Sequence, residues 1–107
     1  MNDVKFLNRL MMLNPALRFS GLVENSGYLN ASVIRVGVSE HLKGRNPEIS
    51  YSQSSYIVDL RKIFENVLGT LNSVIYIYDK VIIFSVPIRN HIVVISADRN
   101  IEIDGVF

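Results

Sequence analysis

Cysteine is absent from the 107 residues of this chain. Its absence excludes disulfide bonds, thiol nucleophiles and zinc sites built from thiolates. Because small secreted domains often depend on disulfides, a chain without them is expected in a reducing cytoplasm. The first residues also lack a basic segment followed by a continuous apolar run, so no secretory signal peptide is predicted.

A charge excess of one sign and long hydrophobic runs are missing as well. Eleven basic residues face ten acidic residues, for a net charge of +1, whereas nucleic-acid-binding domains usually carry a pronounced basic excess. The apolar runs have the length of strands and are interrupted by Asp79-Lys80 and Arg89-Asn90. None approaches the ~20 residues of a membrane span. We therefore expect neither a nucleic-acid partner nor a membrane span.

Catalytic and ligand-binding motifs are lacking too. The sequence has no Gly-x-Ser-x-Gly elbow and no glycine-rich phosphate loop. The two histidines, His41 and His91, are fifty positions apart without acidic residues at ligand spacing, so no metal site is expected. Lys43 and Arg45 flank a glycine and are the best candidates for an anion contact, although a solvated loop explains them more simply. The sequence thus predicts a non-enzymatic protein without catalytic residues or cofactors.

Apolar residues are plentiful, at 49%, enough for the core of a single domain spanning residues 1–107. Apolar residues three and four positions apart predict two helices, and β-branched runs bounded by turn residues predict five strands. The predicted helices are 3–13 and 51–68, the strands are 18–24, 28–35, 73–78, 81–88 and 91–97, and a polar loop covers 37–50. The two-residue connections at 79–80 and 89–90 require antiparallel hairpins. The predicted fold is therefore α+β, in the order α-β-β-α-β-β-β.

The predicted sheet is unusually apolar for the number of helices that can cover it. Strands 81–88 and 91–97 contain runs without polar alternation, which is typical of strands covered on both faces. In helix 51–68, with Ser50, Ser52 or Ser54 as the expected N-cap, one stripe is apolar: Tyr56, Leu60, Ile63, Phe64, Val67 and Leu68. Because uncovered apolar faces are costly in water, we expect a second subunit to complete the structure.

This order of elements resembles the roadblock/LC7 domains of the longin and profilin-like group. The closest likeness is to small uncharacterised roadblock-like proteins of archaea, through the Leu-Asn-Pro-x-x-Arg-Phe-x-Gly-Leu-Val segment at 13–23, Leu68-Gly69, Tyr-Asp-Lys-Val at 78–81 and Val-Pro-Ile at 86–88. Asn14 departs from the acid often found there. The resemblance implies a five-stranded antiparallel sheet in the order 2-1-5-4-3. Roadblock domains continue with a third helix, and the sequence leaves open whether residues 101–107 begin one or whether Phe107 is the native end.

The resemblance also implies a homodimer. In roadblock proteins a matching strand and helix join two sheets into one, so we expect the same interface here. The predicted interface residues are Tyr56, Leu60, Phe64, Ser73, Val74, Ile75, Tyr76, Ile77 and Tyr78. Such a dimer would be a scaffold or regulatory module acting on a small GTPase or on a signalling, motility or trafficking complex.

A second function is compatible with the same sequence. Small-molecule sensors of the PAS and profilin-like type bind ligands between sheet and helix. This alternative predicts a pocket lined by helix 51–68 and loop 37–50, with a few inward polar groups.

Overall fold

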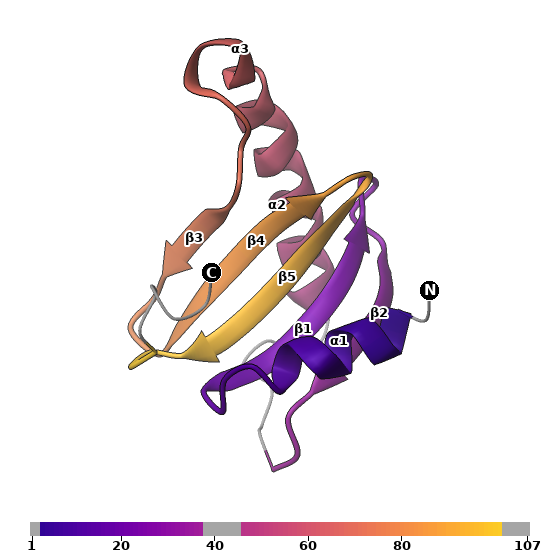
Figure 1. The fold of residues 1–107 in the computed structure, drawn as a ribbon, viewed down its shortest axis with the longest axis vertical. Coiled ribbons are helices and arrows are strands. Elements are labelled where there is room, and N and C mark those ends of the chain that lie inside the picture. The colour runs from indigo at the N-terminus through magenta and orange to yellow at the C-terminus, as the bar shows by residue number, and fades with distance from the viewer. Residues whose placement is uncertain (1–2, 38–45, 102–107) are drawn as a thin grey trace.

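The computed structural model of the chain describes residues 3–37 and 46–101. Its elements are helix α1 (Asp3–Met11), strands β1 (Leu17–Glu24) and β2 (Leu29–Ile34), helices α2 (Asn46–Lys62) and α3 (Glu65–Leu68), and strands β3 (Val74–Ile77), β4 (Val81–Ile88) and β5 (His91–Asp98). The strands form one antiparallel sheet in the order β2-β1-β5-β4-β3 (Figure 1). The α+β class and the strand order expected from the sequence are confirmed.

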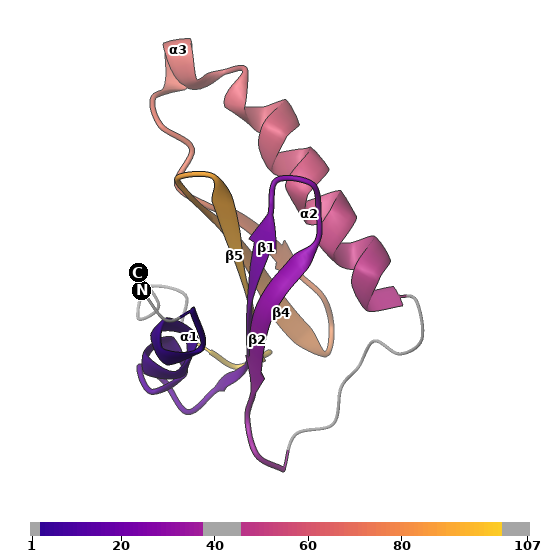
Figure 2. The same ribbon diagram turned by 90° about the vertical axis from the view of Figure 1, so that its right-hand side faces the viewer.

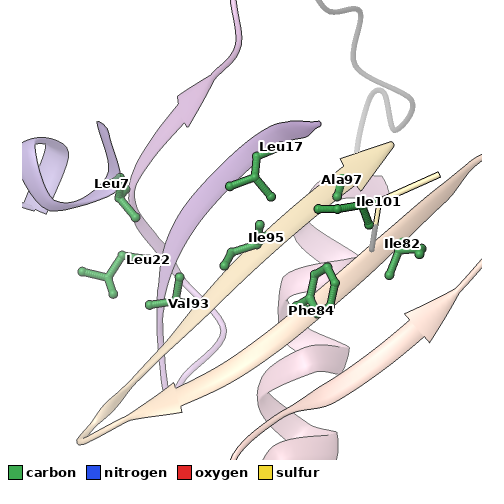
Figure 3. Packing of buried hydrophobic residues seen from close by; sticks show 9 residues of the cluster. All are labelled: Leu7, Leu17, Leu22, Ile82, Phe84, Val93, Ile95, Ala97 and Ile101. Carbon is green, nitrogen blue, oxygen red and sulfur yellow. The ribbon is translucent and has the colours of Figure 1, made fainter. Parts of the chain in front are cut away.

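The sheet lies between two helices that cover opposite faces (Figure 2). On the face of α1, Leu7 is fully buried in a cluster that also includes Leu22, Phe84, Val93 and Ile95, seen in Figure 3. On the opposite face, Val58 of α2 packs in a second cluster with residues of β1 and β5. The central strands are therefore buried on both sides, which explains why β4 and β5 lack polar alternation.

The turn between β1 and β2 also sets the distance between α2 and the sheet. Gly27 has a φ of +90°, a conformation that glycine adopts at little cost. A Cβ atom at this position would lie 2.9 Å from the Cα atom of Ser52 in α2. In addition, the Ser55 hydroxyl donates a hydrogen bond to the Asn25 carbonyl. The turn is thus a docking point for the helix as well as a hairpin connection.

The second helix differs in its bounds from the prediction. It begins at Asn46, inside the predicted loop, ends at Lys62, and is followed by the separate short helix α3. Pro47 occupies the first turn, where a proline removes no helical hydrogen bond and its fixed φ suits a helix. The N-cap predicted at Ser50, Ser52 or Ser54 is therefore wrong, because all three lie within α2.

The buried side chains of α2 are small, while Tyr51 near its start packs partly buried against the sheet and stacks on Phe19 with ring centres 6.2 Å apart. Ser54, Ser55 and Val58 are buried, whereas Tyr56 keeps 65% of its surface exposed and Leu60 is also exposed. Small residues let the helix approach the sheet closely. As a result, the apolar stripe of the second helix points to solvent instead of forming the core.

Candidate interaction surface

Two strands of the sheet have a free edge, and they differ in character. Among the described residues, β2 and β3 each pair with one neighbour only. In β2, a bulge leaves Asn30 without an opposite residue in β1, and Asn30 and Ser32 are exposed. Bulges and polar side chains are common devices that prevent pairing at an edge. β2 is therefore a protected edge.

β3 lacks these devices. Its four residues, Val-Ile-Tyr-Ile, pair with β4 without a register shift. Ile77 is 55% exposed, and Tyr78, directly after the strand, is exposed as well. An open edge with regular backbone and apolar side chains is a template for pairing with another strand.

The second part of the surface is the apolar stripe on α2 and α3, defined as Tyr56, Leu60, Ile63, Phe64, Val67 and Leu68. All six side chains are exposed, including Ile63 at 70% and Val67 at 85%. The C-terminal part of α2 and the whole of α3 extend beyond the strands, as both ribbon views show (Figures 1 and 2). The sheet of the same chain thus cannot cover the end of the stripe.

One cation lies on this stripe. The Arg61 guanidinium carbon is 5.0 Å from the centre of the Phe64 ring, which is the geometry of a cation–π contact. Near the end of the stripe, the Glu65 carboxylate accepts a hydrogen bond of 2.7 Å from the Leu71 backbone N–H. This bond ties α3 to the segment that leads into β3. The stripe and the open edge therefore follow each other along the chain and are connected by this contact.

Beneath α2, three hydroxyl groups gather against β3 and β4. Burial raises the pKa of Tyr76, and the neighbouring Ser85 and Ser54 hydroxyls offset part of this rise. Neither the Tyr76 nor the Ser85 hydroxyl makes a hydrogen bond of good geometry with a described residue. Sequence reasoning considered Ser54 only as an N-cap and missed Ser85. The only signal was Ser85 itself, a polar residue in an otherwise apolar strand.

A charged cluster lies elsewhere, where β1, β2 and β5 meet. The Asp98 carboxylate is 3.0 Å from the Arg18 guanidinium and 3.5 Å from that of Arg35. The hydrogen bond from Arg18 is the main reason that the pKa of Asp98 is lowered. Arg35 also donates to the Pro15 carbonyl, and the Asp98 N–H donates to the Ala16 carbonyl at 2.8 Å. These groups satisfy one another, so the cluster is structural.

The predicted interface residues are distributed over β3, α2 and the link between α2 and α3. The six residues of 73–78 lie in or beside β3, while Tyr56 and Leu60 lie on α2 and Phe64 just before α3. The anion-contact candidates Lys43 and Arg45, together with His41, lie outside the described residues. His91 begins β5, opposite Glu24, and no group of three potential metal ligands occurs within residues 3–37 and 46–101. Within the same ranges, no helix is long and apolar enough to cross a membrane.

A family model for a "family of unknown function (DUF6659)" matches residues 2–107. The chain belongs to this family. No curated protein matches this DUF6659 member.

Several solved structures share the fold of this DUF6659 member. A roadblock/LC7 domain from Streptomyces avermitilis superposes with a TM-score of 0.71 at 12% identity, covering 95% of this chain and 82% of that one. The gliding protein MglB from Thermus thermophilus gives 0.76 at 11% identity, covering 96% and 76%. A structure described as MglB with tetrameric arrangement gives 0.77 at 12% identity, covering 96% and 75%. The resemblance to roadblock/LC7 domains predicted from the sequence is confirmed for the fold.

Proposed function

We propose that this DUF6659 member is a non-enzymatic protein-interaction module that acts as a cytoplasmic homodimer. The observation that carries the proposal is the apolar stripe of α2 and α3, exposed on the same stretch of chain as the open edge of β3. Monomeric proteins rarely expose contiguous apolar surface of this kind unless it binds something. A second copy would cover the stripe and pair the edge in a single interface.

The cellular role that we propose is regulation of a small GTPase or of a signalling, motility or trafficking complex. Its support is the likeness in fold to a protein described as a gliding protein. Because one fold can host many functions, this step is an analogy of fold. The sensor alternative requires loop 37–50, of which residues 38–45 lie outside the described residues, and it stays a prediction.

Light scattering after size-exclusion chromatography tests the homodimer. We expect a dimer at micromolar concentration and a monomer for Leu60→Asp, because a buried charge without a partner strongly opposes association. Val36→Asp is the matched control: Val36 follows β2, far from β3 in the sheet order, and is 98% exposed. It should remain a dimer. A strictly monomeric wild-type protein at high micromolar concentration would overturn the proposal.

A further inference from the structure

We infer that two protomers pair β3 with β3 in antiparallel fashion, with the two-fold axis at Tyr76. This inference rests on the proposed homodimer and names the register of its interface. The starting point is which backbone groups of β3 face the open edge.

The hairpin between β3 and β4 settles that orientation. The Tyr78 N–H donates to the Val81 carbonyl at 2.9 Å, so Tyr78 and Val81 form a hydrogen-bonded pair. In antiparallel sheets such pairs alternate with pairs that exchange no hydrogen bonds. Following the register along β3, Tyr76 and Val74 also point their backbone groups toward β4. The N–H and C=O groups of Ile75 and Ile77 therefore point outward, to the open edge.

Symmetry then limits the register. Two identical antiparallel strands related by a two-fold axis place one residue opposite its own copy. Of the four residues of β3, an axis at Val74 would place neither outward residue opposite a residue of the partner's β3, which leaves Ile75, Tyr76 or Ile77. An axis at Ile75 or Ile77 pairs that residue with its own copy and leaves the other outward isoleucine opposite a residue outside β3. An axis at Tyr76 places Ile75 opposite the partner's Ile77 and Ile77 opposite the partner's Ile75, so every outward group of the strand is paired within β3.

The side chains favour the same register. Ile75-Tyr76-Ile77 reads the same in both directions, so an axis at Tyr76 creates two isoleucine–isoleucine cross-strand pairs on the face opposite α2. β-Branched apolar pairs stabilise sheets, and these would cover Ile77, now 55% exposed. An axis at Ile75 would place Ile77 opposite the partner's Ser73. An axis at Ile77 would place Ile75 opposite the partner's Asp79, so both alternatives pair an isoleucine with a polar side chain.

The other face is also consistent with this axis. Tyr76 lies on the side of the sheet covered by α2, in the layer of Ser54 and Ser85. With the axis perpendicular to the joined sheet, both α2 helices lie on one face and the two Tyr76 rings are neighbours beneath them.

Because the chain has no cysteine, single-cysteine variants report the register directly. A disulfide requires Cα atoms about 4.4–6.8 Å apart, and facing residues that exchange no hydrogen bonds are about 4.5 Å apart. We expect Tyr76→Cys to form a covalent dimer under mild oxidation as the main species on a non-reducing gel. Ile75→Cys and Ile77→Cys alone should remain uncrosslinked, but a co-refolded mixture of the two should crosslink.

The outcomes separate this inference from the proposed homodimer. Crosslinking of Ile75→Cys alone or Ile77→Cys alone, in a protein that is dimeric by light scattering, would overturn the Tyr76 axis and leave the homodimer standing. A monomeric wild-type protein would overturn the homodimer itself. If circular dichroism shows that Tyr76→Cys does not fold, the mixture of Ile75→Cys and Ile77→Cys still tests the register. These two variants crosslink with each other only when the axis lies at Tyr76.

Discussion

At the scale of single residues, Asp98 connects protonation with stability. Its pKa in the folded chain lies below the ordinary value of 3.8, chiefly because Arg18 donates a hydrogen bond to the carboxylate. A lowered folded pKa means that the ionised group stabilises the fold above the unfolded pKa. This stabilisation disappears as the pH falls through the folded value.

Replacing Asp98 by Asn tests this link. We expect a loss of about 1 kcal/mol or less at pH 7, since the carboxylate is about one-third exposed and water screens the ion pairs. The difference between wild type and variant should shrink as the pH falls through the folded pKa, as measured by urea unfolding at a series of pH values from 7 downward. Asp59→Asn, at an exposed position of α2, is the control. A difference that is the same at all of these pH values would contradict the role of ionisation.

Removing the Tyr76 hydroxyl should change the stability in the opposite direction to removing the Asp98 carboxylate. The hydroxyl is buried, and it forms no well-formed hydrogen bond with a described residue. Because such a group bears a desolvation cost, Tyr76→Phe should leave stability unchanged or raise it by about 1 kcal/mol. Tyr78→Phe, which removes an exposed hydroxyl, should have almost no effect in the same thermal unfolding measurement. A clear loss for Tyr76→Phe would show that its hydroxyl has a partner in solution.

At the scale of elements, two glycines with similar positive φ angles separate strain from contact. Gly27 and Gly69 have φ values of +90° and +88°, but an added Cβ would meet α2 at Gly27 and nothing within 4 Å at Gly69. Gly69→Ala should cost about 1 kcal/mol through backbone strain alone, and Gly27→Ala about 3 kcal/mol or more because α2 must also move. Urea unfolding measures both. Equal losses would mean that the turn does not hold the helix.

Strand positions were predictable because they depend on local signals, whereas the full strand order came from the resemblance to roadblock/LC7 domains. Two-residue connections at Asp79-Lys80 and Arg89-Asn90 force antiparallel pairing, and the double-sided apolar runs of β4 and β5 place them inside the sheet. The start of α2 was mispredicted because Asn46-Pro47 was interpreted as a loop, although proline is favoured in a first turn. The break between α2 and α3 was also missed, because no proline or glycine marks it in the sequence.

At the scale of the whole molecule, the direction of the apolar stripe could not be predicted. A helix with a stripe at three- and four-residue spacing looks the same in sequence whether it packs on its own sheet or on a partner. What decides here is the opposite side of α2, where Ser54, Ser55 and Val58 are buried and Ser52 lies against Gly27. That fit depends on contacts between residues some thirty positions apart, which periodicity along one helix does not contain.

The unequal edges of the sheet determine how far assembly can proceed. If both edges were open, copies could add head to tail without limit, as in a fibre. With Asn30 bulged out of β2 and polar side chains along that strand, growth would stop in the proposed dimer once two β3 edges have met. The joined sheet then carries a protected β2 at each end, and the chain is expected to remain a dimer even at the high concentrations at which open edges aggregate.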